Sequence, residues 1–353
     1  DNTHDIDMNP DAEAPIPEWK VYFDGNFWEP SGKDRAGTEI RLDKQFEWAG
    51  HHWIIPAAYS CNKGLVLDFC MCTPAEDIRE FMKKWDLTPE NDSCLNFTQE
   101  QQLQIDLDNP LCLDIIPCLK LNGTTMQASH SCSVVFNPCL PDEINNEPEA
   151  KWELKHYELD TSYGWMIFRV AFLWPDKRRP AIKSLSLTIE QQPFRMPGPH
   201  FKIHSPGDQF AFSHPVSETK YTLTVQKLEQ QTLSQNRMDS DRWLYPTHFT
   251  TMSYTLSPEP DNDISIHDCA DNDKPLEVAP ATDSFSPEVQ TDLACIDIIG
   301  GADEPTIILC GNNNQANLHV AYSALHFKPV SDDIEWRIEF NIIRFSKKTF
   351  LLI

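Results

Sequence analysis

Short runs in which hydrophobic and polar residues alternate dominate this chain, and they predict β-strands. In residues 334–342 every second side chain is apolar, and the positions between them carry charged or amide side chains. This alternation is typical of an antiparallel sheet with one buried face. Residues 164–174 are apolar at both alternating sets of positions except at Arg169, which predicts a strand covered on both sides.

The same pattern recurs along the chain, separated by turn residues, and it predicts an all-β protein. Asp24-Gly25 predicts a tight hairpin turn, and Gly64 can take the positive φ that a hairpin loop needs. The strands expected in hairpins lie in 21–28, 53–72, 164–190 and 317–345, further strands lie at 209–213, 220–228 and 248–256, and irregular strands are expected between 94 and 139. Many short antiparallel strands favour β-sandwich domains.

One short helix is expected at about residues 74–85. Thr73 is a candidate N-cap, Pro74 suits the first helical position, and Glu76 completes a capping box with Thr73. Apolar residues then recur at spacings of three and four, which is typical of a helix with one buried face.

Composition changes divide the chain into two expected domains. Residues 1–18 form an acidic arm, residues 19–140 a β-rich domain with a cysteine-dense segment, and residues 151–353 a β-sandwich domain. Residues 141–150, rich in Pro, Asn and acids, form the expected linker, and residues 257–292 an acidic loop. A length of 353 residues is compatible with two domains.

The charge balance restricts the partners of the protein. The 29 Lys and Arg residues against 54 Asp and Glu residues give a formal net charge of −25. Nucleic acids and anionic membranes are therefore not expected as partners, because both are bound through positive charge. No apolar run approaches the length of a membrane span, so we expect a soluble protein whose partner is another protein or a small polar ligand.

The cysteines indicate a reducing compartment. Eight of the 11 cysteines fall between residues 61 and 139, many of them in apolar runs, and no Cys-x-x-Cys pair occurs. We expect reduced thiols in a cytoplasmic protein, and no signal peptide is visible in the acidic residues at the start. The alternative is a secreted protein with disulfides and a cleaved signal.

Two groups of residues are candidate metal ligands, although no cofactor is the leading expectation. His200, His204 and His214 would suit a transition metal, with ordinary surface or capping histidines as the alternative. Asp261 and Asp263 begin a run with oxygen ligands at alternate positions, as in calcium loops. The EF-hand pattern itself is absent, and a solvated acidic loop is the alternative.

The most specific string is Ile-Ile-Gly-Gly-Ala-Asp-Glu-Pro-Thr at residues 298–306. It resembles the Ile-Ile-Gly-Gly-Ala-Asp-Gly-Pro-Thr segment of the β subunit of sodium-translocating decarboxylases, with Glu304 in place of Gly, over about ten residues. The resemblance also implies an uncharacterised family of soluble bacterial proteins. Sodium pumping does not carry over, because no membrane span is present. From the residues alone, Gly300, Gly301 and Asp303 predict a tight turn between two apolar strands, with a ligand or ion site as the alternative.

These observations favour a non-catalytic binding or interaction protein. The alternative is an enzyme that acts on carbohydrate or another small polar substrate through carboxylates or a His-bound metal. No catalytic residue can be assigned from the sequence. Convergence of several of the candidate His and Asp side chains in one cleft would favour the enzyme.

Overall fold

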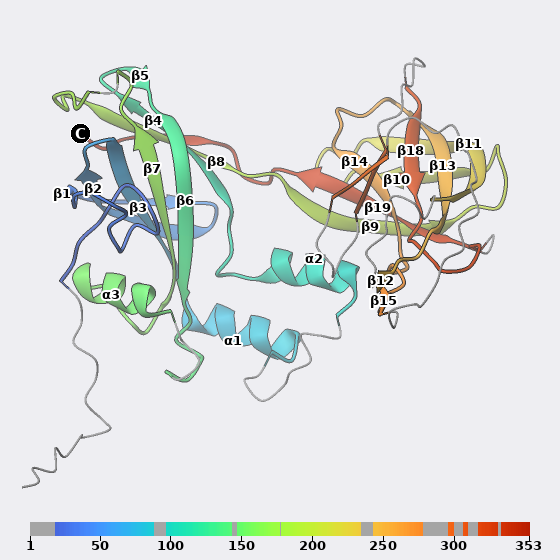
Figure 1. Ribbon diagram of the computed structural model, residues 1–353, viewed down its shortest axis with the longest axis horizontal. Helices are drawn as coiled ribbons and strands as arrows, with labels where there is room; N and C mark the ends of the chain where they lie inside the picture. Colours follow the sequence, from blue (N-terminus) through green and yellow to red (C-terminus); the bar gives the residue numbers. More distant parts are fainter. Residues whose placement is uncertain are drawn as a thin grey trace, which may run out of the picture. The chain divides into compact units, whose positions relative to one another are not determined.

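Antiparallel strands are the main regular elements of the structure, a computed structural model shown in Figure 1. It describes residues 18–87, 97–142, 147–176, 178–233, 243–277, 317–330 and 333–353, and the backbone of 296–299 and 306–309. The strands form open antiparallel sheets, which confirms the all-β sandwich-like fold. They belong to two compact units. None of the helices in the described residues is long and apolar enough to cross a bilayer.

The first unit is a sandwich of two sheets, made from described residues between 18 and 87, from Asp108–Gln192 and from Phe345–Ile353. The larger sheet has the order β1 (Thr38–Trp48), β2 (His51–Ser60), β3 (Gly64–Thr73), β7 (Gly164–Leu173) and β6 (Gln127–Phe136). The smaller has the order β20 (Lys348–Leu351), β8 (Leu185–Gln191), β4 (Ile115–Leu121) and β5 (Thr124–Thr125). Their facing side chains, such as Phe69 and Leu187, form one buried core.

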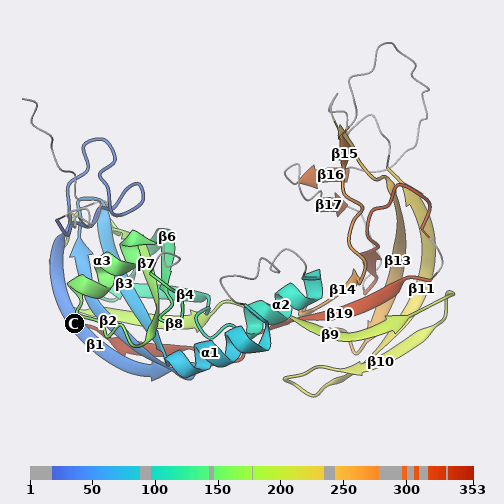
Figure 2. The same cartoon turned by 90° about the horizontal axis from the view of Figure 1, so that it is seen from below.

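The outer face of the larger sheet, which points away from that core, is covered by a helix and by an N-terminal segment. Helix α3 (Pro148–His156) and the segment that begins at Trp19 lie against it (Figure 2). Apolar side chains of this cover, such as Phe23 and Leu154, pack on Cys70 and Ile167 of the sheet. Both faces of β3 and β7 are therefore buried, and for β7 the apolar pattern of residues 164–174 predicts this.

The second unit contains residues 97–107 and Pro193–Arg344. One sheet has the order β10 (Gln209–Ser213), β11 (Lys220–Thr232), β13 (His248–Ser257) and β18 (His319–Tyr322). The other has the order β14 (Ile264–Asp268), β19 (Glu335–Ile342) and β9 (Phe194–Lys202). A core that includes Leu223, Met252 and Trp336 lies between them. Two short ribbons pair β12 (Trp243–Leu244) with β15 (Leu276–Glu277), and β16 (Ile296–Ile299) with β17 (Thr306–Leu309).

The expected helix is confirmed as α1 (Ala75–Lys84), but its expected cap is wrong. The hydroxyl of Thr73 donates to the carbonyl oxygen of Pro110 at 2.9 Å, and no side chain caps the helix. Two more helices, α2 (Gln99–Asp108) and α3, replace expected irregular strands and linker. Helix α2 begins with a capping box in which Thr98 and Gln101 bond to each other's backbone N–H groups. Its apolar residues alternate as they do in a strand, so the sequence pattern did not predict a helix here.

Long-range strand pairing also differs from the expected hairpins and domain limits. Strand β7 pairs with β3 and β6, whereas β8 pairs with β4 and β20, so residues 164–190 form no hairpin. Residues 317–345 form none either, because β18 pairs with β13 and β19 lies between β14 and β9. Residues 21–28 form a turn without strands. Helix α3 occupies part of the expected linker, and the first unit continues to Gln192.

Candidate functional site

A buried ion pair crosses the outer face of the larger sheet in the first unit. Asp68 on β3 and Arg169 on β7 are direct partners in the strand register. Arg169 Nε and Nη2 donate to the two carboxylate oxygens of Asp68 at 2.7 and 2.8 Å, and both side chains are fully buried. This bidentate geometry fixes both side chains. Each is a single charge within an apolar strand, and this signal in the sequence could have revealed the pair.

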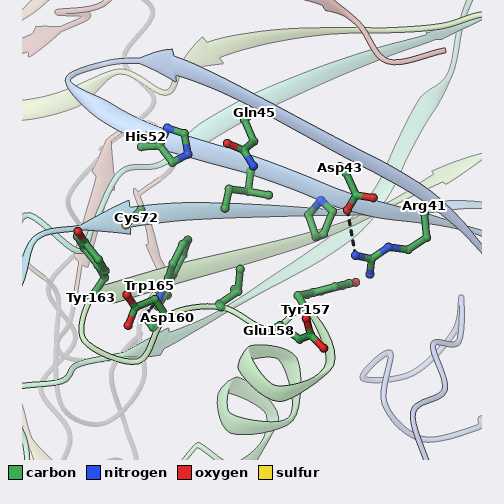
Figure 3. A pocket seen from close by; sticks show the side chains of 13 residues that line it. Arg41, Asp43, Gln45, His52, Cys72, Tyr157, Glu158, Asp160, Tyr163 and Trp165 are labelled. Carbon is green, nitrogen blue, oxygen red and sulfur yellow. Dashed lines mark hydrogen bonds and ion pairs between the residues drawn. The ribbon is translucent and has the colours of Figure 1, made fainter.

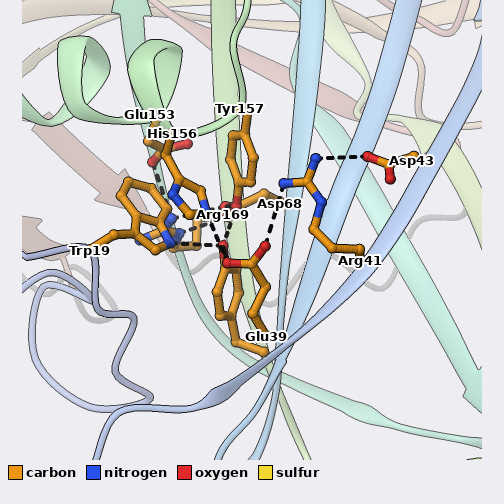
Figure 4. Close-up of polar contacts among 10 residues, drawn as sticks. Trp19, Glu39, Arg41, Asp43, Asp68, Glu153, His156, Tyr157 and Arg169 are labelled. Carbon is orange, nitrogen blue, oxygen red and sulfur yellow. Dashed lines mark hydrogen bonds and ion pairs between the residues drawn. The ribbon is translucent and has the colours of Figure 1, made fainter.

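Aromatic side chains extend the hydrogen-bond network from the ion pair toward the surface (Figure 4). The hydroxyl of Tyr157, at the end of α3, donates to Asp68, and it lies 2.6 Å from the hydroxyl of Tyr59. Trp19 Nε1 donates to that Tyr59 hydroxyl at 3.0 Å. Burial raises the pKa of both tyrosines well above the usual range, so they remain protonated donors.

The outer part of this cluster is held by Glu39 of β1. Its carboxylate accepts a hydrogen bond from Tyr59 at 3.3 Å and lies 2.8 Å from His156 Nε2. The ring of His156 stacks on Trp19 with 4.1 Å between centroids. The cluster therefore ties α3 and the segment at Trp19 to the sheet.

Glu153 of α3 lies beside this network but differs from its members because its side chain lacks hydrogen bonds among the described residues. One of its oxygens lies 3.3 Å from Arg169 Nη2, but neither oxygen has a hydrogen-bond partner among the described residues. Burial raises the pKa of Glu153 well above its usual range, and the nearby charge of Arg169 opposes this shift without overcoming it. Asp68 is then the carboxylate that balances the charge of Arg169.

A groove of about 470 Å³ opens on the same outer face, beside the cluster (Figure 3). Side chains of β1, β2 and β3 form one side, and residues 157–165 form the other. The polar and aromatic residues that line it are Arg41, Asp43, Gln45, His52, Tyr157, Glu158, Asp160, Tyr163 and Trp165. Its volume is in the range of sites for small ligands.

The polar side of the groove depends on an irregularity in β1. The register with β2 shifts between Arg41 and Lys44, and Asp43 has φ of 48°. Such bulges redirect side chains. Arg41 Nη2 donates to Asp43 at 2.9 Å, and the guanidinium of Arg41 lies 5.7 Å from the centre of the Tyr157 ring. Tyr157 thus contacts both the groove and the buried cluster.

The opposite side of the groove includes the turn before β7 and the buried Trp165 at the start of that strand. Trp165 Nε1 donates to the carbonyl oxygen of Asp160 at 2.8 Å, and the carboxylate of Asp160 accepts from Ser162 N at 2.9 Å. The hydrogen bonds from Ser162 lower the pKa of Asp160. Tyr163 is 41% exposed, so its ring is available to a ligand at the rim.

The histidines and aspartates expected to bind metal are not gathered into one site. His204 lies in a turn where the carboxylate of Asp208 accepts from its backbone N–H. Nδ1 of His214 accepts from two backbone N–H groups of the turn that follows it, and its Nε2 lies 3.3 Å from Asp263. Asp261 is exposed. His200 lies in a different cluster, described below.

The segment with the local resemblance is only partly described. Strands β16 and β17 pair antiparallel, with Ile299 opposite Thr306. Gly300, Gly301 and Asp303 lie outside the described residues, as does most of the acidic loop. No disulfide forms among the cysteines of the part of the chain that the structure describes.

No protein-family profile, curated protein or solved structure matches this chain.

Proposed function

We propose that this chain is a non-catalytic binding protein whose first unit binds a neutral carbohydrate in the groove beside Tyr157. The observation that carries the proposal is the arrangement of Arg41, Asp43 and Gln45 along β1, across the groove from Tyr163 and Trp165. The polar side chains of β1 thus face a side of the groove that carries aromatic rings together with the carboxylates of Glu158 and Asp160.

This arrangement suits the two surfaces of a sugar. Each sugar hydroxyl both donates and accepts hydrogen bonds. A guanidinium donates, a carboxylate accepts, and an amide does both, so β1 offers every type of partner. Tyr and Trp combine a large apolar ring with a polar atom, and such rings pack on the C–H face of a pyranose.

The charges of the groove favour a neutral ligand over an anion. Three of its lining residues are acidic, Asp43, Glu158 and Asp160, and Arg41 is paired with one of them. An anionic ligand would meet a net negative surface. A ligand with only a positive charge would accept no hydrogen bond from the side-chain amide of Gln45.

The carboxyl groups support binding over hydrolysis. A glycosidase of the usual kind needs a pair of carboxyl groups beside the bond to be cleaved, one of which holds a proton. Among the carboxyl groups of the described residues, the one with a strongly raised pKa is Glu153, which is fully buried and does not line the groove. The pKa of Asp160 in the groove is lowered, which disfavours a role as general acid.

The proposal is tested with an array of neutral oligosaccharides, followed by titration calorimetry with the disaccharides that bind. Tyr163→Ala and Gln45→Ala are each expected to weaken binding by about tenfold, since each removes about 1–1.5 kcal/mol of contacts. Gln127→Ala, an exposed residue of β6 outside the groove, is the matched control and leaves affinity unchanged.

Two results would contradict the proposal. The first is the absence of binding to any neutral sugar on the array, and the second is undiminished binding by the Tyr163→Ala protein. Release of cleaved sugar during the titration would instead support the enzyme alternative.

A further inference from the structure

A second cluster of chemically reactive side chains lies on the three-stranded sheet of the second unit, on the face opposite its core. Trp336 of β19 points into the core, so its neighbours Glu335 and Arg337 point to the other face. His200 of β9 is opposite Arg337 in the register. Cys269 follows β14 and donates its backbone N–H to the carbonyl oxygen of Glu335 at 2.9 Å.

This register brings three different ligand types together. Ligand atoms of His200, Cys269 and Glu335 all lie within 4.8 Å of one another, and no other group of three possible metal ligands is found in the part of the chain that the structure describes. His200 Nδ1 lies 3.5 Å from Glu335 Oε1. The side chains of His200 and Glu335 are partly exposed, so both have room to move toward an ion.

The imidazole of His200 is oriented by Glu100 of α2. Its Nε2 lies 2.8 Å from Glu100 Oε2, and the N–H at that position donates to the carboxylate. Nδ1, which lies 3.5 Å from Glu335 Oε1, is then the ring nitrogen left for a metal. Histidines that bind metals almost always donate their second ring N–H to a carboxylate, a carbonyl or water in this way.

The positive charges nearby are already balanced. Arg337 Nη2 donates to Glu339 Oε1 at 2.5 Å, and both side chains are buried. Arg337 Nη1 also lies 3.8 Å from Glu100, and Arg195 lies 3.7 Å from Glu339. Lys202, the register partner of Glu335, donates to the carboxylate of Asp333 at 3.0 and 3.2 Å, so these three cations have carboxylate partners other than Glu335.

We propose that His200 Nδ1, Cys269 Sγ and the carboxylate of Glu335 bind a zinc ion, with the fourth position open to water or a ligand. A thiolate and an imidazole select Zn²⁺ over Ca²⁺ and Mg²⁺, which take oxygen ligands. Tetrahedral zinc holds its ligand atoms roughly 3.3–3.8 Å apart, so small side-chain rotations complete the site. The site is separate from the groove and does not depend on it.

Cobalt is the probe, because Co²⁺ occupies tetrahedral zinc sites and is coloured. The full chain, without a histidine tag and freed of metal by a chelator, is titrated with Co²⁺ and then with Zn²⁺. We expect one equivalent to give a thiolate-to-cobalt charge-transfer band and intense d–d bands, and Zn²⁺ to remove both.

Substitutions assign the ligands. Cys269→Ser removes the charge-transfer band, and His200→Gln and Glu335→Gln each weaken zinc binding by at least about 100-fold. Glu100→Gln keeps the spectrum and weakens binding by about 10–100-fold, since it only orients His200. The matched controls are His204→Gln and Cys118→Ser, which lie outside the cluster and leave binding unchanged.

The proposal fails if the wild-type protein gives no charge-transfer band, or if the band persists in Cys269→Ser. It also fails if His204→Gln weakens binding as much as His200→Gln does. Unfolding midpoints of the metal-free variants, measured in parallel, show that each substituted chain is folded. Because His200 and Glu335 are partly exposed, their substitutions keep the test valid even if Cys269→Ser is unstable.

Discussion

Replacing Glu153 by Gln is expected to stabilise the first unit increasingly as the pH rises, although Glu153 lies at ion-pair distance from Arg169. Its carboxyl group is fully buried, and burial raises its pKa well above the usual range. The folded protein therefore holds a proton that the unfolded chain releases. A raised folded-state pKa means that the stability from this group is complete below the unfolded pKa and falls as the pH rises.

The size of the effect follows from linkage. One proton held by the folded state alone changes the free energy of unfolding by about 1.4 kcal/mol per pH unit. Between pH 5 and 7 the free energy of unfolding of the wild-type protein thus falls by at most about 2.7 kcal/mol relative to that of the Glu153→Gln protein, because an amide side chain does not titrate. Gln also resembles the neutral carboxyl group in shape, so packing is preserved.

Urea unfolding at pH 5, 6 and 7, followed by tryptophan fluorescence, measures this difference. Glu80→Gln, an exposed site on α1 in the same unit, is the matched control, and its stability relative to wild type stays constant with pH. A Glu153→Gln protein that is less stable than wild type by about 3–5 kcal/mol at every pH would refute the reasoning, because that is the cost of breaking a buried ion pair.

Three further outcomes are expected. Trp336→Ala costs about 3–5 kcal/mol in the second unit, because the ring is buried in its core, and a loss below about 1 kcal/mol in chemical denaturation would contradict this. In native protein at neutral pH, iodoacetamide modifies the exposed Cys112 long before Cys61, since burial raises the pKa of the Cys61 thiol to about 12, and peptide mass spectrometry gives the order. Hydrogen bonds from His204 N and Ser205 N lower the pKa of Asp208. The melting temperature of the wild type is therefore expected to fall relative to that of Asp208→Asn between about pH 5 and pH 3. A difference in melting temperature that stays constant over this range would contradict the prediction.

The sequence predicts well which face of a strand is buried, but it predicts poorly which strands pair with each other. The alternation around Trp336 correctly assigns the buried face of β19, because it depends only on neighbouring residues. The same pattern wrongly places Arg337 and Glu339 in solvent, whereas each is only 1% exposed. Their burial comes from residues distant in the sequence, and Glu100 of α2, which contacts Arg337, is one of them.

The candidate sites show the same limit. Both groups of expected metal ligands were chosen by spacing along the chain, but His200 meets Cys269 and Glu335 through pairing between three strands. Spacing within one segment carries no information on such pairing. The groove was missed because its two sides come from β1 and from residues 157–165, which β3 and β7 bring together across the sheet.

The order of segments in the first unit has a consequence for biosynthesis. Its smaller sheet needs β20, and its core needs Leu352, yet the ribosome makes both only after all of Pro193–Arg344. During that interval the edge of β8 that later pairs with β20 has no strand beside it. Open strand edges template aggregation, so a nascent chain would benefit from a chaperone that covers this edge until translation reaches residue 352.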